Sequence, residues 1–234
     1  MLKKIKLNNQ KQIKILISEK KHGSMRLDNN PQNKLNRIKF LEKNSISIEK
    51  LISAKLKNSN KCALIKNHQK KIIENTDALI TDKPNLYLSI TTADCIPVFF
   101  YSPQCVAIAH AGWRGITENI IPNTLKAFSE FELKKNLKII MGPGIGSCHF
   151  KIQKDVLKKF KHYPKALHLK KQKIFVDLKK IIKQQLFKTG IPQKNIHNLD
   201  ECTYCNSQKF FSARRERLKT NKVMLSIIAI EHQK

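Results

Sequence analysis

The stretch TADCIPVFFYSPQCVAIAHAGWRG, residues 92–115, decides the fold of this chain. It contains two short apolar runs, Ile96–Tyr101 and Val106–Ala109, separated by a polar segment with a proline at position 103. Apolar runs rich in β-branched and aromatic residues on both sides of such a turn are typical of an antiparallel hairpin. The sequence therefore predicts a β-hairpin at this place.

Cys95 and His110 lie equally far from the middle of the turn, so hairpin pairing places them face to face at its open end. A thiol and an imidazole in this position can bind zinc or form a nucleophilic Cys/His pair. Asp94 adds a carboxylate beside them. A structural hairpin with an incidental Cys and His remains the alternative at this point.

The other predicted elements favour a single α+β domain over residues 1–234, with one mixed sheet flanked by helices, because no regular βαβ order is present. Asp177 predicts the start of a helix and Gly190 its end. Pro122 predicts either a kink or a first helical turn. The expected strands are Ile13–Ser18, Leu86–Thr91, Leu137–Met141 and Val223–Ile230, and the expected helices are Asn33–Lys43, Thr117–Phe131, Gln153–Phe160 and Leu178–Lys188.

The charge of the chain is high but diffuse. Its 234 residues include 46 Lys plus Arg against 17 Asp plus Glu, a formal net charge of +29. A basic excess of this size is typical of nucleic-acid binders. The basic residues are mostly scattered Lys, accompanied by abundant Ile and Asn, which codon bias in an A+T-rich genome produces without any functional cause. We favour that interpretation and expect no nucleic-acid partner.

The composition indicates a folded protein of the cytoplasm. Apolar residues make up 41% of the chain, enough for a sizeable core. No apolar run reaches the ~20 residues of a membrane span, and the N-terminal apolar patch is shorter than the ~7–15 residues of a signal-peptide core. The six cysteines are therefore expected as thiols in a reducing compartment.

Glycine is scarce, with seven in the chain, yet five of them fall in two loops at residues 109–115 and 142–149. A sequence that avoids glycine keeps it where the backbone needs positive φ or a close approach. The loop from Gly142 to Gly146 is expected either to cradle an anion with its N–H groups or to form a plain turn.

Four motifs identify a resemblance. They are Thr92–Pro97, His110–Gly115, Gly142–Cys148 and Phe210–Arg215, and they occur in this order. Together they resemble the YfiH/DUF152 family, also called laccase-domain or multicopper polyphenol oxidoreductase proteins. The resemblance covers about residues 10 to 230. It implies a zinc-dependent purine nucleoside phosphorylase that acts on adenosine, inosine and methylthioadenosine, with adenosine deaminase activity as a further expectation.

The resemblance also implies a metal site of His, Cys and His. By position, Cys95 and His110 are two of these ligands. Asn58 occupies the place of the first family His, and His68, ten residues later, is the alternative third ligand. The resemblance implies zinc, while copper, suggested by the older family name, suits a lone Cys with one or two His less well.

Further roles follow from the resemblance and from the chemistry of phosphorolysis. Arg suits phosphate because its planar fork donates two hydrogen bonds. The expected catalytic residues are Cys95, His110, Asp94 and Arg114, and the expected substrate contacts are Arg37, Arg214, Arg215, Gly142 and Phe211. The expected partners are a purine nucleoside and phosphate, with the chain a monomer or a weak homo-oligomer.

Two other hypotheses stay open. One is a metal-independent hydrolase or deamidase in which His110 activates Cys95. The other is a basic nucleic-acid-binding protein. In addition, Cys202 and Cys205 have the spacing of a zinc half-site, for which Cys148-His149 is the available partner pair; a structural zinc there is the less favoured interpretation of these residues.

Overall fold

The computed structural model describes residues 2–7, 11–131, 136–216 and 222–232. Within them, two six-stranded mixed sheets form the centre of the molecule. In the first sheet the four strands on one side pair antiparallel, and the last two pairings are parallel. Its strands, in spatial order, are β1 (Leu2–Lys6), β2 (Lys11–Ile17), β15 (Met224–His232), β7 (Tyr87–Thr92), β3 (Leu51–Lys55) and β5 (Ile72–Glu74).

The second sheet has parallel pairs at both edges and antiparallel pairs in its middle. Its strands, in spatial order, are β14 (Ile196–Asn198), β10 (Lys138–Met141), β8 (Ile96–Tyr101), β9 (Val106–Ala111), β6 (Ala78–Thr81) and β4 (Cys62–Leu64). A small antiparallel sheet is formed by β11 (Lys151–Ile152), β13 (Lys173–Val176) and β12 (Leu167–Lys170).

Five α-helices occur in the described parts of the chain. Asn30 caps the first, accepting from the N–H groups of Gln32 and Asn33, and Asp177 caps the last, accepting from the N–H of Lys180. Each cap satisfies N–H groups that have no partner inside the helix. The helices are α1 (Pro31–Lys43), α2 (Trp113–Thr117), α3 (Ile120–Phe128), α4 (Lys154–Leu157) and α5 (Leu178–Lys188).

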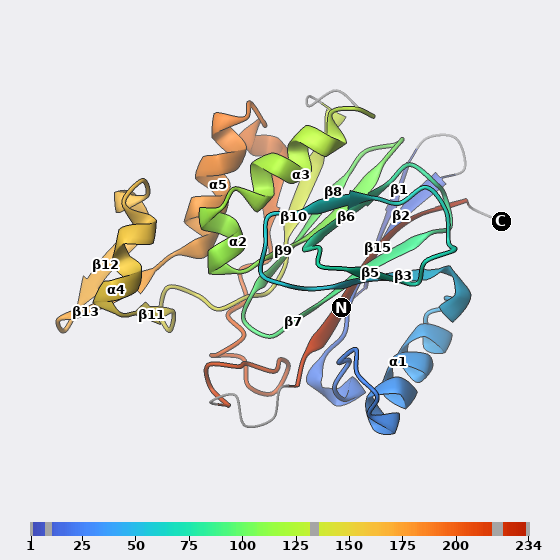
Figure 1. Ribbon diagram of the computed structural model, residues 1–234, viewed down its shortest axis with the longest axis horizontal. Coiled ribbons are helices and arrows are strands. Elements are labelled where there is room, and N and C mark those ends of the chain that lie inside the picture. The colour runs from blue at the N-terminus through green and yellow to red at the C-terminus, as the bar shows by residue number, and fades with distance from the viewer. Residues whose placement is uncertain (1, 8–10, 132–135, 217–221, 233–234) are drawn as a thin grey trace.

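These elements stack in four layers. Helix α1 covers the outer face of the first sheet, the two sheets pack against each other, and α2, α3 and α5 cover the far face of the second sheet, while the small sheet and α4 project to one side (Figure 1). The layers follow from alternation along the strands. On β8, Val98 and Phe100 face the helices, whereas Phe99 and Tyr101 face the first sheet. Both faces of the central strands are therefore apolar.

The structure corrects the expectation of one mixed sheet. Two mixed sheets are present, because β8 and β9 bury both faces and need a second layer of strands as well as a layer of helices. The helix expected over Thr117–Phe131 is also wrong. It is divided at Asn119, which has a left-handed φ of 69°, into α2 and α3, and Pro122 lies in the first turn of α3, where a missing N–H costs nothing.

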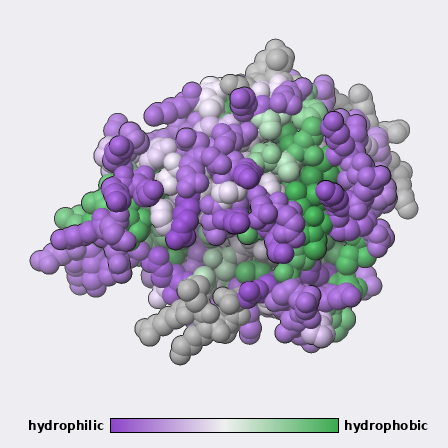
Figure 2. All heavy atoms as spheres, viewed as in Figure 1, coloured by the Kyte–Doolittle hydropathy of each residue, from purple (hydrophilic) through white to green (hydrophobic). Residues whose placement is uncertain are grey.

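The surface agrees with the diffuse charge seen in the sequence. Hydrophilic side chains cover most of the face shown in Figure 2 and do not gather in one area of it. None of the described helices combines the length and the apolar character that crossing a bilayer requires.

Candidate functional site

The predicted hairpin is confirmed, and it brings Cys95 and His110 together. Strands β8 and β9 pair with Pro97 opposite His110. A Cβ built on Gly112 would lie 3.0 Å from Cys95 Sγ, 3.4 Å from Asn58 Oδ1 and 3.4 Å from His110 Cε1. Three potential ligands thus converge over Gly112. A side chain at this position would enter the space between them, which is the physical reason for glycine here.

Asp77 fixes the orientation of His110. This fully buried carboxylate accepts a hydrogen bond from His110 Nδ1 at 2.9 Å. Because an ionised carboxylate can only accept, Nδ1 carries the proton, and Nε2 is left for the contact with Cys95. Metal-binding histidines are typically held in this way, with the second nitrogen bonded to a carboxylate. Sequence analysis gave Asp77 no role.

Asp77 also organises the loop that carries Asn58. Its two oxygens accept from the backbone N–H groups of Lys57 (3.2 Å), Asn58 (3.0 Å) and Ser59 (2.7 Å), and from Ser59 Oγ (2.7 Å). Burial opposes the charge, but the hydrogen bonds from His110 and Ser59 hold the pKa of Asp77 below its usual value. One buried anion therefore positions two of the three converging groups.

The pKa of His110 is raised to about 10. Burial by itself disfavours the charged ring, but the neighbouring Cys95 sulfur and the Asp77 carboxylate outweigh it. Without a bound cation the imidazole therefore holds a second proton at neutral pH. A metal ion has to displace that proton, so metal affinity at this site increases with pH.

Asn58, and not His68, occupies the third position. Asn58 has a left-handed φ of 57°, a conformation that Asn adopts more readily than most residues. This backbone turn aims its amide at Cys95 and His110. His68 is exposed and lies beside Glu49, away from the cavities described below.

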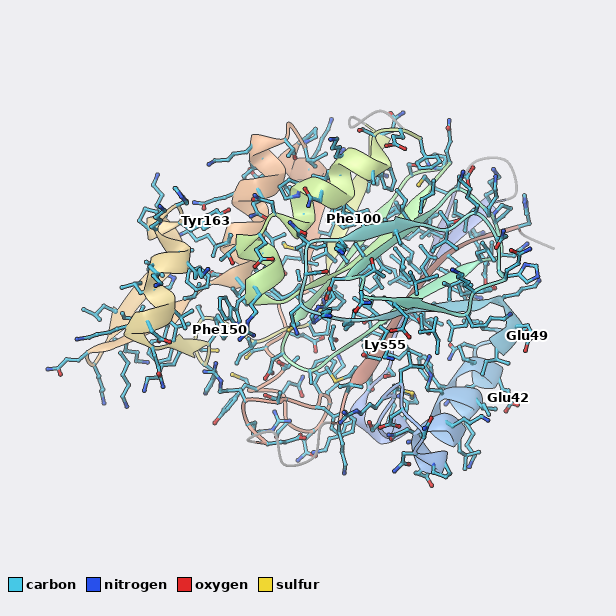
Figure 3. All side chains as sticks on the ribbon, viewed as in Figure 1. Glu42, Glu49, Lys55, Phe100, Phe150 and Tyr163 are labelled. Carbon is cyan, nitrogen blue, oxygen red and sulfur yellow. The ribbon has the colours of Figure 1, made fainter. Side chains whose placement is uncertain are left out.

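Two cavities meet at the Cys95–Asn58 junction. The first, of about 320 Å³, is here called the basic cavity because Arg26, Lys55 and Lys222 line it. The second, of about 560 Å³, is called the aromatic cavity and is lined by Trp113, Phe150, Arg114 and Arg214. Asn58, Ala93, Cys95 and Ala213 belong to both. Lys55 and Phe150, one from each cavity, are labelled in Figure 3.

Arg114 and Arg214 thus lie where the sequence places ligand contacts. The guanidinium of Arg114 stacks over Trp113, 4.5 Å from the ring centre, and that of Arg214 lies 5.3 Å from the ring centre of Phe150. Two cation–π pairs therefore form part of the aromatic cavity.

Asp94 has a positioning role. Its carboxylate accepts from Thr203 Oγ1 at 2.6 Å and from the N–H of Arg214 at 2.7 Å. Its own carbonyl accepts from the N–H of Ile145. Asp94 therefore ties two loops to the start of β8, and both carboxylate oxygens are engaged in doing so.

Four expected substrate contacts do not line either cavity. Arg37 is buried in α1, where it donates to Met25 O and Ser53 Oγ, and burial lowers its pKa to about 10, which leaves it charged at pH 7. Arg215 donates to the carbonyls of Thr203, Tyr204 and Phe210. Phe211 packs in the core with Phe210 and Met224, and Gly142 packs against Pro97.

The glycine loop at 142–146 does not cradle an anion. Its N–H groups already donate within the protein: Gly142 to Pro97 O, Gly144 to Glu201 O, Ile145 to Asp94 O and Gly146 to Cys202 Sγ. Gly144 is needed for space, because a Cβ there would lie 2.5 Å from Ile96 Cγ1.

The fold and this site define a class: a single-domain α+β protein with a Cys/His/Asn group at the junction of two cavities. The chain belongs to the family described as Multi-copper polyphenol oxidoreductase laccase, which matches residues 18–231.

Proteins similar to this chain include two curated purine nucleoside phosphorylases. The chain is 32% identical over 170 residues to that of Bacteroides thetaiotaomicron, covering 68% of this chain and 63% of the relative. It is 34% identical over 158 residues to the Staphylococcus aureus purine nucleoside phosphorylase YlmD, covering 64% and 59%. The match therefore spans less than two thirds of the length of either relative.

Solved structures confirm the fold. Bacillus licheniformis hypothetical protein YfiH aligns with a TM-score of 0.85 at 27% identity, covering 94% of this chain and 93% of that one. Neisseria meningitidis protein NMB0706, of family DUF152, aligns with a TM-score of 0.80 at 21% identity, covering 98% and 99%. The predicted resemblance to the YfiH family and the α+β class are both confirmed.

The donor set at Cys95 fits one zinc ion better than a copper cluster. Zinc accepts thiolate, imidazole and oxygen ligands, which are the three groups that converge over Gly112. A blue-copper centre uses two His with one Cys, and the described residues that line the two cavities include one His, His110. The group therefore does not fit the multicopper chemistry in the family's name.

Proposed function

We propose that this chain is a zinc-dependent purine nucleoside phosphorylase that acts on adenosine, inosine and methylthioadenosine. The proposal rests on one observation above all: two cavities of different character meet at the Cys95–Asn58 junction. In phosphorolysis, phosphate attacks the anomeric carbon of ribose as the base leaves from the opposite side. A site for this reaction therefore needs an anion pocket and a base pocket on either side of the sugar.

The aromatic cavity suits the purine. Trp113 and Phe150 offer apolar ring surface, which stacks on bases, and Arg114 and Arg214 can donate hydrogen bonds to ring acceptors. The basic cavity suits phosphate, since Arg26, Lys55 and Lys222 concentrate positive charge there. The ribose then lies over Cys95, where the two cavities join.

The metal group has a defined place in this arrangement. Cys95, His110 and Asn58 would hold the ion, and Asp77 keeps the proton on His110 Nδ1 so that Nε2 faces the site. A bound zinc ion supplies Lewis acidity and lowers the pKa of bound water. The surrounding side chains bind and orient the substrates and exclude water, which lowers the entropic cost of the reaction.

Adenosine deamination is the weaker part of the proposal. Zinc deaminases use a Glu close to the metal as general acid and base. Among the described residues that line the two cavities, Asp94 is the one carboxylate, and both of its oxygens are engaged. We therefore expect phosphorolysis to exceed deamination.

The test is a product analysis with purified protein, adenosine or inosine, and phosphate. Phosphorolysis yields free base and ribose 1-phosphate, hydrolysis yields ribose, and deamination of adenosine yields inosine. Cys95→Ala should abolish both turnover and zinc binding, while Cys62→Ala, on β4, should retain them. Absence of ribose 1-phosphate with every nucleoside would refute the proposal.

Separate variants assign the two cavities. Arg114→Lys keeps the charge but loses the planar fork, so it should raise the KM for the nucleoside. Lys55→Ala should raise the KM for phosphate instead. If Arg114→Lys changes the phosphate KM alone, then Arg114 holds phosphate, as the sequence suggested, and the cavity assignments are reversed.

A second function is favoured by one observation. Asp77, His110 and Cys95 are linked in series, in the order of a catalytic triad. A metal-independent Cys/His hydrolase would use this arrangement directly. Chelator treatment separates the two functions, because the hydrolase retains its activity without metal and loses it on alkylation of Cys95.

A further inference from the structure

Four side chains with metal-binding chemistry meet outside the site described above. Cys148 and His149 follow the glycine loop after β10, and Cys202 and Cys205 follow β14. The three Sγ atoms and His149 Nδ1 lie within 4.8 Å of one another. We propose that these four residues bind a second Zn²⁺ ion, with a structural role, that holds their two loops together.

The distances between ligand atoms match a tetrahedral zinc site. Cys148 Sγ lies 3.6 Å from both Cys202 Sγ and Cys205 Sγ. His149 Nδ1 lies 3.2 Å from Cys148 Sγ and 3.3 Å from Cys205 Sγ. Zinc bond lengths of about 2.3 Å to S and about 2.0–2.1 Å to N, at tetrahedral angles, require separations of about 3.8 Å for S–S and about 3.6 Å for S–N. The four ligands need to move by only a few tenths of an ångström.

The backbone builds this site from both loops. Gly144 and Cys202 form a parallel β-bridge, and the N–H of Gly146 donates to Cys202 Sγ at 3.2 Å. A Cβ on Gly146 would lie 3.1 Å from Cys148 Sγ and 3.5 Å from Cys202 Sγ, so glycine leaves room for the sulfur atoms. The cluster is therefore arranged by main-chain contacts in addition to its side chains.

His149 is held in place as a ligand by a ring contact. It stacks on Tyr204, with 3.8 Å between ring centres and 15° between ring planes. The stacking limits rotation of the imidazole and keeps Nδ1 beside Cys148 and Cys205. Three thiolates and one neutral imidazole are also a known donor set of closed structural zinc sites, as distinct from catalytic sites with an open position.

Positive groups surround the cluster. Zinc with three thiolates carries a net charge of −1, which favours nearby cations. Lys179 interacts electrostatically with Cys202, and the guanidinium of Arg214 donates to His149 O and Lys151 O. The surroundings therefore support the charge that the occupied site would have.

The position of the cluster gives the ion a consequence for the neighbouring cavity. Arg214 and Phe150 line the aromatic cavity, and both are attached to the loop that contains Cys148 and His149. A metal cross-link between this loop and Cys202–Cys205 would keep that wall in place. The proposal itself does not depend on the function assigned to the cavity.

Metal analysis tests the proposal directly. Cys95→Ala removes a ligand from the first site, so zinc retained by this variant, after reduction and removal of free metal, belongs to the second. We expect one Zn²⁺ per chain in Cys95→Ala and none in Cys95→Ala/Cys205→Ser. Cys95→Ala/Cys62→Ser is the matched control and should retain the ion. Equal zinc content in the two double variants would overturn the proposal.

A second measurement uses the wild-type chain and so does not depend on variants that fold. Alkylation with iodoacetamide, followed by mass spectrometry, should show zinc-dependent protection of Cys148, Cys202 and Cys205, with the labelling of Cys62 unchanged. Removal of zinc by a chelator should lower the melting temperature. Equal labelling with and without zinc, or a Cys148–Cys202 disulfide in freshly reduced protein, would overturn the proposal.

Discussion

Asp77→Asn tests whether one buried carboxylate controls the site. The amide keeps the size of the carboxylate but replaces one acceptor oxygen by an NH₂ donor. At the Oδ2 position this NH₂ would face the three donors of Lys57 and Ser59, and at Oδ1 it would face the two of Asn58 and His110. The second orientation loses fewer hydrogen bonds, so we expect the NH₂ to face His110.

This orientation changes the tautomer of the histidine. His110 can accept from the new NH₂ only if Nδ1 gives up its proton, and the neutral ring then carries it on Nε2, the nitrogen that faces the site. Two hydrogen bonds to a charged group, at about 1.5–3 kcal/mol each, give a loss of about 3–6 kcal/mol in the free energy of unfolding. Loss of a carboxylate that orients a metal-binding His weakens metal affinity about 10–100-fold.

The assays are urea unfolding of the metal-free proteins and zinc competition with a chromophoric chelator. Asp82→Asn is the matched control, because Asp82 forms a surface ion pair with Lys83, and such pairs contribute about 0–1 kcal/mol. If Asp77→Asn binds zinc as tightly as wild type and unfolds within about 1 kcal/mol of it, then Asp77 does not orient His110.

Three further predictions concern other contacts. Asn58→His should tighten zinc binding by about two orders of magnitude in the chelator assay, because structural zinc gains about 10–16 kcal/mol from four ligands; unchanged affinity contradicts this. Gly144→Ala should cost about 1–3 kcal/mol in urea unfolding, since its Cβ would lie 2.5 Å from Ile96 Cγ1; equal stability contradicts this. Hydrogen bonds hold the pKa of Glu231 below 4.5 although burial opposes them, so wild-type stability should fall as pH decreases below that value. Glu231→Gln should flatten this dependence in melting-temperature measurements and lose about 3 kcal/mol at pH 7, because Lys14 stays buried without its partner charge; an unchanged pH profile contradicts this.

Local patterns in the sequence predicted the elements that depend on local interactions. Strand β8 begins and ends where the apolar run does, and α5 occupies the range set by the Asp177 cap and the Gly190 stop. The short strands β4 and β5 were missed, because three residues at the edge of a sheet carry little periodic signal. Their conformation comes from pairing with neighbours distant in sequence.

The sequence by itself determined the family, the hairpin, and the meeting of Cys95 with His110, since a tight turn fixes which residues of two strands are opposite each other. Tertiary structure decided the rest of the site. Asp77 reaches His110 across β6 and β9, and Asn58 arrives from a separate loop. Arg37, chosen from the same kind of motif evidence, is buried under α1 instead. Spacing along the chain specifies partners only a few residues away, whereas contacts between layers depend on how whole sheets pack, and that is fixed only when the chain is folded.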